Sequence, residues 1–237
     1  MRGTSLLDSS GRPAAAVLFD CDGLLADTEP QWGTAMETVL RSHGHQTDDL
    51  AGLTSELTGA SIESTVQRLT ELLGLPGSSR GTIERTLLTA YAETVAQQGV
   101  HALPGAAALV RTVATSLPVA VVSNSPRDLV LLVLDAMGLT DVVAVVVGAH
   151  GTCRPKPDPA PYLLACQLLG VAATRCAAFE DSATGARAAV AAGLGVTVVP
   201  PADAVPDSYP VACRIVGSLA EVVGGPAVAA SKGGGGD

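Results

Sequence analysis

Short apolar runs that alternate with helical segments constrain the fold of this chain more than any other feature. Five runs are rich in Val and Ala and stop at polar, Gly or Pro residues: residues 14–20, 119–123, 143–148, 176–181 and 195–200. A sixth, shorter candidate covers residues 213–216. Runs of this length and composition are typical of strands buried on both faces of a parallel sheet.

The segments between the later runs have the periodicity of helices. Apolar residues recur at helical spacing around Leu109, Leu129 and Tyr162, and the Ala-rich residues 183–192 end at Gly193. Glycine is a common residue just after the end of a helix. Strands that alternate with helices predict an α/β fold with a doubly wound parallel sheet, similar to a Rossmann domain.

One long stretch breaks this alternation. Residues 30–103 contain no run that resembles a strand, and three sets of apolar residues there follow helical spacing, beginning at Trp32, Ile62 and Ile83. We therefore expect residues 30–103 to form a separate helical domain inserted into an α/β core made of residues 13–29 and 104–223.

Both ends of the chain have the composition of unstructured segments. Residues 1–12 are polar and contain Gly and Pro, and residues 224–237 end in SKGGGGD. We expect a disordered N-terminus over residues 1–12 and a flexible Gly-rich tail over residues 224–237.

Composition excludes several classes of function. The 237 residues are 47% hydrophobic and 16% charged, so the chain is not an intrinsically disordered protein. Acids outnumber bases by 23 to 14, which argues against nucleic-acid and membrane partners, since both require a basic face. The five cysteines have no CxxC spacing, and no apolar run suits a signal peptide or a membrane helix, so we expect a cytoplasmic protein.

Polar side chains follow four of the predicted strands. They are Asp20 and Asp22 after the first, Ser123 and Asn124 at the second, Lys156 after the third, and Glu180 and Asp181 at the fourth. Because ligands bind beyond the carboxyl ends of parallel strands, we expect these side chains to meet at one edge of the sheet.

This set of residues favours phosphoryl chemistry. Clustered carboxylates repel one another, and a hard cation with oxygen ligands, most simply Mg²⁺, would compensate them. A carboxylate can also attack phosphorus. Asp20 and Asp22 are two residues apart, so on an extended backbone they point the same way, whereas the intervening Cys21 points toward the core. Ser123, Asn124 and Lys156 would supply donors and a positive charge to phosphate oxygens.

The same motifs resemble a known family. FDCDGLLADTEP at residues 19–30 is followed in order by Ser123-Asn124, Lys156-Pro157 and Glu180-Asp181-Ser182. This set is similar to that of the haloacid dehalogenase-like hydrolase superfamily, in the branch of β-phosphoglucomutase and small sugar-phosphate or hexitol-phosphate phosphatases. The helical insert resembles the first cap type of that superfamily, and the likeness covers nearly all of residues 14–223.

The resemblance implies a role for each matching residue. Asp20 would be the nucleophile that forms an aspartyl-phosphate, and Asp22 the general acid and then the base. Asp20, the backbone carbonyl of Asp22, and Asp181 would hold Mg²⁺, with Glu180 as a supporting residue or a further ligand. Ser123 and Asn124 would bind the transferring phosphoryl group, and Lys156 would neutralise charge around it.

The insert would then act as a cap that excludes water and selects the substrate. Glu29 and Trp32, where the insert begins, are candidate substrate contacts. Gly59 and Ile62 lie in a segment that resembles the specificity loop of the cap.

Departures from the patterns of individual branches narrow the activity. Haloacid dehalogenases lack the second aspartate, and phosphonoacetaldehyde hydrolases use a cap lysine, whereas this chain has Asp22 and no lysine in residues 30–103. β-Phosphoglucomutases carry an arginine where this chain has Ile62, which cannot grip a second phosphate.

We therefore predict a Mg²⁺-dependent phosphatase of small phosphorylated metabolites, of the sugar-phosphate or polyol-phosphate class. A phosphomutase is the nearest alternative, and a non-catalytic metabolite-sensing protein is an alternative of another class. We expect a monomer, with a homodimer as the alternative.

Lysine usage singles out one position. Of the 14 Lys and Arg residues, only Lys156 and Lys232 are lysines, and Lys232 lies in the Gly-rich tail. A coding bias toward arginine explains most of this count. The retention of Lys156 predicts a site that needs the compact ammonium group rather than a guanidinium.

Overall fold

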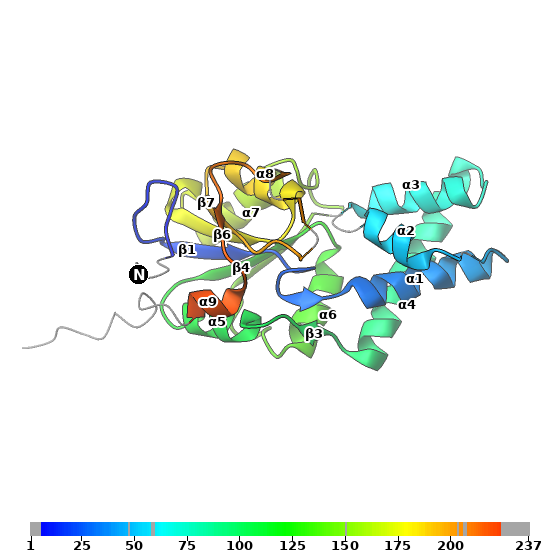
Figure 1. Ribbon diagram of the computed structural model, residues 1–237, viewed down its shortest axis with the longest axis horizontal. Coiled ribbons are helices and arrows are strands. Elements are labelled where there is room, and N and C mark those ends of the chain that lie inside the picture. Colours follow the sequence, from blue (N-terminus) through cyan, green and yellow to red (C-terminus); the bar gives the residue numbers. More distant parts are fainter. Residues whose placement is uncertain are drawn as a thin grey trace, which may run out of the picture.

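The structure is a computed structural model that describes residues 6–46, 48–57, 60–149, 151–202, 204–205 and 208–223. These residues form an α/β lobe, which contains the large sheet, and a second lobe made of helices (Figure 1). Within the described residues, no helix combines the length and the hydrophobicity needed to cross a membrane.

The α/β lobe is built on a six-stranded parallel sheet with the strand order β5-β4-β1-β6-β7-β8. The strands are β1 (Ala16–Phe19), β4 (Val119–Ser123), β5 (Val145–Gly148), β6 (Cys176–Glu180), β7 (Gly195–Val198) and β8 (Arg214–Ile215). All six predicted strands are therefore present. β4 has the predicted bounds, and the others are shorter at one or both ends.

Helices cover both faces of this sheet, which confirms the doubly wound fold. They are α5 (Ala106–Ala114), α6 (Arg127–Ala136), α7 (Ala160–Leu169), α8 (Ala183–Ala191) and α9 (Leu219–Val223), with the 3₁₀ turn η2 (Ala173–Arg175) before β6. Alternate β1 residues serve opposite faces: Val17 and Phe19 pack in the cluster of α5, α6 and α9, and Ala16 and Leu18 in that of α7 and α8 (Figure 1).

The inserted lobe consists of helices, as the sequence predicts. They are α1 (Glu29–Ser42), α2 (Leu50–Leu57), α3 (Ile62–Leu72) and α4 (Arg80–Gln98), with the 3₁₀ turn η1 (Gly77–Ser79) between α3 and α4. Buried apolar residues of α1, α3 and α4, such as Met36, Leu69 and Leu87, form its core. We call this lobe the cap.

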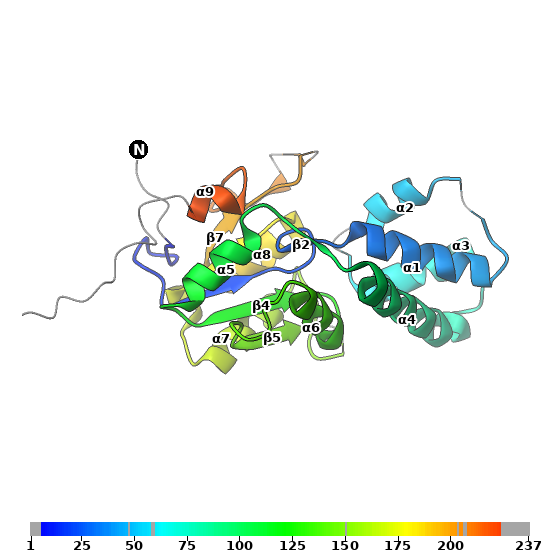
Figure 2. The ribbon, with the colours of Figure 1, turned by 90° about the horizontal axis from the view of Figure 1, so that it is seen from below.

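Two short strands join the lobes. β2 (Ala26–Asp27) pairs antiparallel with β3 (His101–Ala102), so both connections to the cap run through one small ribbon (Figure 2). The expectation that residues 30–103 contain no strand is therefore wrong for β3. A strand of two residues is too short for a periodic pattern, and its partner is distant in the sequence.

The N-terminal segment also differs from expectation. Leu6–Arg12, predicted to be disordered, form a turn in which Asp8 is buried. The Asp8 carboxylate accepts hydrogen bonds from the backbone N–H of Ser10 and Arg12 and forms an ion pair with Arg175 at 3.0 Å. This local use of an aspartate side chain orders a polar segment that has no apolar pattern. Residues 1–5 and 224–237 lie outside the described residues.

Candidate active site

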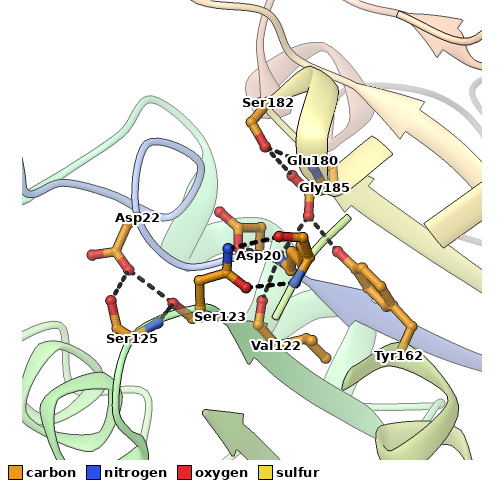
Figure 3. A network of polar contacts seen from close by, with 11 residues as sticks. Asp20, Asp22, Val122, Ser123, Ser125, Tyr162, Glu180, Ser182 and Gly185 are labelled. Atoms are coloured by element: carbon orange, nitrogen blue, oxygen red, sulfur yellow. Dashed lines mark hydrogen bonds and ion pairs between the residues drawn. The ribbon is translucent and has the colours of Figure 1, made fainter. Parts of the chain in front are cut away.

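The polar residues predicted at the strand ends meet at one edge of the sheet (Figure 3). Asp20 directly follows β1, Ser123 ends β4, and Glu180 ends β6, while Lys156 comes from the loop after β5. These three strands are neighbours in the sheet, so their carboxyl ends bring together residues that lie up to 160 positions apart. The topology thus creates the site from four separate segments.

Lys156 lies at the centre of this group and is buried. Its Nζ donates to Asp20 Oδ1 at 2.5 Å, to Glu180 Oε1 at 2.6 Å and to the backbone carbonyl of Val122 at 2.8 Å. The ammonium group has three N–H donors, and each has an acceptor. Lys156 therefore ties the ends of β1, β4 and β6 together, and the two carboxylates raise its pKa against the opposing effect of burial.

Glu180 is fully buried and held by other side chains. Besides Lys156, the hydroxyl of Tyr162 on α7 donates to its Oε1 at 2.5 Å, and Ser182 donates to its Oε2 at 3.2 Å (Figure 3). A Cβ on Gly185 of α8 would lie 2.0 Å from Glu180 Oε1, so only glycine leaves room for this carboxylate. Both oxygens of Glu180 thus have protein partners, which favours a supporting role.

Asp181 is buried but is not satisfied by protein groups. Its Oδ1 has no hydrogen-bond partner, and its pKa is raised well above the ordinary value by burial and then by the charges of Asp20 and Glu180. Gly23 has a positive φ of 82°, and a Cβ there would lie 2.2 Å from Asp181 Oδ2. The chain therefore leaves Asp181 facing the site with an oxygen in need of a partner.

Asp20, Glu180 and Asp181 fit a divalent cation. One carboxylate oxygen from each lies within 4.8 Å of the others, and the three negative charges face the single positive charge of Lys156. Burial, opposed by Lys156, raises the pKa of Asp20 to about 8, and a further cation beside it would favour the ionised form. Such oxygen ligands suit Mg²⁺. The carboxylate of Asp22 is not part of this group.

Asp22 is held by hydroxyl groups instead. Thr28 donates to its Oδ1 at 2.7 Å, and Ser123 and Ser125 donate to its Oδ2 at 2.9 and 3.0 Å. Figure 3 shows Asp22 beside the end of β4, apart from the carboxylates around Asp20. The two aspartates of the first motif therefore have different surroundings, one charged and one rich in hydroxyl donors, which suits different chemical roles.

The side chain of Asn124 pairs with the backbone of Lys156. Its Oδ1 accepts from the backbone N–H of Lys156 at 2.8 Å, and its Nδ2 donates to the backbone carbonyl of Lys156 at 3.3 Å. The amide group therefore fixes the loop that carries Lys156. This pairing forms because a primary amide matches a peptide group in both donor and acceptor. Asn124 also lines the cavity, and its contact with the transferring phosphoryl group stays a prediction.

Cys21 lies in the apolar core, as its place between the two aspartates predicts. Its side chain is fully buried, and burial raises the pKa of its thiol well above the ordinary value. A buried thiol with a raised pKa is a poor nucleophile. The chemistry of the site therefore rests on the carboxylates.

A cavity of about 490 Å³ lies between the site and the cap. It falls within the range of about 300–1,000 Å³ that is typical for small-molecule sites. Glu29, Trp32 and Ile62, the predicted cap contacts, all line it, and Trp32 stacks on Tyr91 with a centroid distance of 4.0 Å. Gly59 lies outside the described residues.

Sequence reasoning missed several residues of the site. The helical spacing indicates that Tyr162 is a core residue of a helix, but it does not show the partner that a buried tyrosine hydroxyl needs. Gly185 interrupts an Ala-rich helix, where glycine is unfavourable and so signals a close approach. Thr28 and Ser125, the donors to Asp22, lie beside predicted motif residues, but nothing in the sequence shows which carboxylate they contact.

Comparison with known proteins places these motifs in a family. The family model described as haloacid dehalogenase-like hydrolase matches residues 14–193. The chain belongs to this hydrolase family. The parallel sheet, the helical cap and the position of the motif residues at the strand ends agree with this assignment.

Three similar proteins illustrate the relationship. Phosphoglycolate phosphatase from Yersinia pestis is 30% identical over 188 residues, which cover 76% of this chain and 80% of that protein. Hexitol phosphatase A from Escherichia coli is 32% identical over 190 residues, covering 78% and 83% of the two chains. The structure of β-phosphoglucomutase from Clostridium difficile shares the fold, with a TM-score of 0.74, 19% identity, and coverage of 88% and 93%. The predicted hydrolase superfamily and branch are thus confirmed.

Proposed function

We propose that the protein is a Mg²⁺-dependent phosphatase that hydrolyses small phosphorylated metabolites of the sugar-phosphate or polyol-phosphate class in the cytoplasm. The observation that carries this proposal is the difference between the surroundings of the two aspartates. Asp20 lies beside a buried ammonium and two further carboxylates, whereas Asp22 is held by three hydroxyl groups. This arrangement suits a nucleophile next to an acid–base group.

In the first step, an Asp20 carboxylate oxygen attacks phosphorus, and the bond from phosphorus to the ester oxygen breaks. Asp22 gives its proton to the departing alcohol oxygen, which leaves an aspartyl-phosphate on Asp20 and a carboxylate on Asp22. In the second step, the Asp22 carboxylate takes a proton from the water that attacks phosphorus, and the bond from phosphorus to the Asp20 oxygen breaks. Inorganic phosphate is released, and both aspartates return to their starting states.

The remaining residues orient these two and balance charge. Lys156 fixes one oxygen of Asp20, Glu180 holds Lys156 in place, and the hydroxyl of Tyr162 holds Glu180. Mg²⁺, held by Asp20 and Asp181 with Glu180 close by, would offset negative charge on the phosphoryl oxygens. The unpartnered Oδ1 of Asp181 supports this assignment.

The test is the replacement of the nucleophile by its isostere. Asp20→Asn should abolish phosphate release from an aryl phosphate and from a polyol phosphate, with a thermal unfolding midpoint near that of the native protein. Activity of the native protein should also disappear with a chelator and return with added Mg²⁺. Undiminished, metal-dependent turnover by Asp20→Asn would overturn the proposal.

The phosphomutase alternative is separable by a second assay. A mutase must hold a second phosphate in the cap, and Ile62, an apolar residue, lines the cavity at the relevant position. Phosphate release from β-glucose 1-phosphate should therefore exceed its isomerisation to glucose 6-phosphate. The reverse result would favour the mutase.

A further inference from the structure

The charges that line the cavity are unevenly distributed. Among the described residues of its lining, Lys156 is the single basic side chain, whereas the acids are Asp20, Asp22, Asp27, Glu29 and Asp181. Among the described residues, the lining away from Lys156 is therefore acidic or neutral.

The charge of Lys156 is not free to serve a second anionic group on a substrate. Its three contacts are with Asp20, Glu180 and the Val122 carbonyl, at the floor of the site. Its ammonium also lies 5.0 Å from the centre of the Tyr162 ring. The phosphate ester itself would take up what remains of this positive charge.

Two arginines of the cap form ion pairs outside the cavity. Arg68 forms a two-point ion pair with Glu56, with Nε to Oε1 at 2.8 Å and Nη2 to Oε2 at 3.3 Å. Arg41 pairs with Glu37 at 2.7 Å on α1. Neither arginine is among the residues that line the cavity. The described cap wall therefore presents no cation to the substrate.

What the cap wall presents is apolar surface and hydroxyl groups. Trp32, Met36 and Ile62 contribute the apolar surface, and Thr54, Ser55 and Thr65 carry the hydroxyls. Such a surface suits carbon-bound hydrogens and neutral hydroxyl groups. A carboxylate or a second phosphate would lose its hydration there, next to Asp27 and with no cation among the described residues of the cap wall.

We propose, on the basis of the phosphatase function above, that the enzyme selects monophosphate esters whose alcohol part carries no further negative charge. Neutral polyol and sugar monophosphates satisfy this rule, whereas phosphoglycolate, bisphosphates and phosphorylated carboxylic acids do not. The substrate named for the Yersinia pestis relative is thus excluded for this chain, although the two proteins share the family.

A matched pair of substrates tests the rule. 2-Phosphoglycolate and 2-hydroxyethyl phosphate differ only in a carboxylate against a hydroxymethyl group. We expect kcat/KM to be at least about tenfold higher for 2-hydroxyethyl phosphate, a factor that corresponds to about 1.4 kcal/mol. Equal or higher kcat/KM for 2-phosphoglycolate would overturn this inference and leave the phosphatase proposal intact. Failure to hydrolyse either ester or an aryl phosphate would instead overturn the phosphatase proposal, and this inference with it.

Two variants test whether the cap wall is the cause. Ser55 lines the cavity and is exposed, so Ser55→Arg adds a cation with little disturbance of the core. It should shift the kcat/KM ratio at least about fivefold toward 2-phosphoglycolate, whereas Ser55→Gln, a neutral control, should not. Asp27→Asn removes an acid from the wall, keeps an oxygen that can accept from the backbone N–H of Glu29, and should shift the ratio in the same direction. A ratio unchanged in both charge variants, each with a native-like unfolding transition, would refute the role of the cap charge.

Discussion

The two halves of the cavity follow opposite principles of construction. On the core side, charged groups are buried and hold one another: Lys156 reaches two carboxylates and a carbonyl, and Glu180 receives three donors. On the cap side, the described wall is apolar or carries hydroxyls. Its acids, Asp27 and Glu29, lie in β2 and at the start of α1. For the proposed phosphatase, this contrast implies that the core half would determine which bond breaks and the cap half which molecule is accepted.

The largest effect on activity is expected for a replacement of Asp22 on the core side. Asp22→Asn should lower kcat/KM for an alkyl phosphate by about 10²–10⁴-fold, because an amide cannot protonate the leaving oxygen. p-Nitrophenyl phosphate, whose leaving group needs no proton, should lose less in the same measurement. An equal loss for both esters would show that Asp22 does not act as the acid.

The next test concerns the shape of the central cation. Lys156→Arg keeps the charge but replaces a compact group with a planar fork, which does not fit three acceptors at 2.5–2.8 Å around one nitrogen. We expect kcat to fall about a hundredfold. The control is Arg154→Lys, since Arg154 is an exposed neighbour, and it should retain native turnover. Near-native activity of Lys156→Arg would show that coding bias alone explains the lysine count.

A smaller effect should come from the buried tyrosine. Tyr162→Phe removes the hydroxyl that donates to the charged Glu180, so the free energy of unfolding should fall by about 1.5–3 kcal/mol in urea denaturation. Tyr209→Phe removes a bond to the neutral carbonyl of Asp181 and should cost only about 0.5–1.5 kcal/mol. Equal losses would contradict the view that the core side depends on its charged contacts.

The smallest effect is expected in the cap. Ser61 caps α3 by accepting from the backbone N–H of Ser64, directly before Ile62 in the cavity wall. Ser61→Ala should cost about 1 kcal/mol of stability, while Ser79→Ala should cost almost nothing, because Ser79 makes no side-chain cap before α4. Both free energies can be read from urea unfolding curves. A large drop in kcat for Ser61→Ala would contradict the view that the cap does not determine the rate of the chemical step.

The core side of the site was largely predictable from the sequence. Its residues directly follow apolar runs, and the parallel topology brings strand ends together whatever the details of packing. Asp20, Ser123, Lys156 and Glu180 therefore meet as expected. The same argument could not find Tyr162, because its helix pattern shows burial but not the partner of its hydroxyl.

Other features depended on contacts between distant segments. The pairing of β2 with β3 joins two-residue strands about 75 positions apart, and no local pattern encodes it. The pairing of the Asn124 amide with the backbone of Lys156 joins residues 32 positions apart, and no local pattern predicts it. The buried Asp8 likewise pairs with Arg175, which lies 167 positions further along the chain.

The small β2–β3 ribbon has a consequence for how such a protein can change over evolution. The cap leaves and rejoins the core at two hydrogen-bonded positions, so its ends are as close as neighbouring strands permit, about 5 Å. An insertion with adjacent ends is readily tolerated, because the host fold need not rearrange to accept it. The residues between the two strands can therefore be exchanged as a unit, which would let one catalytic α/β lobe serve many different substrates.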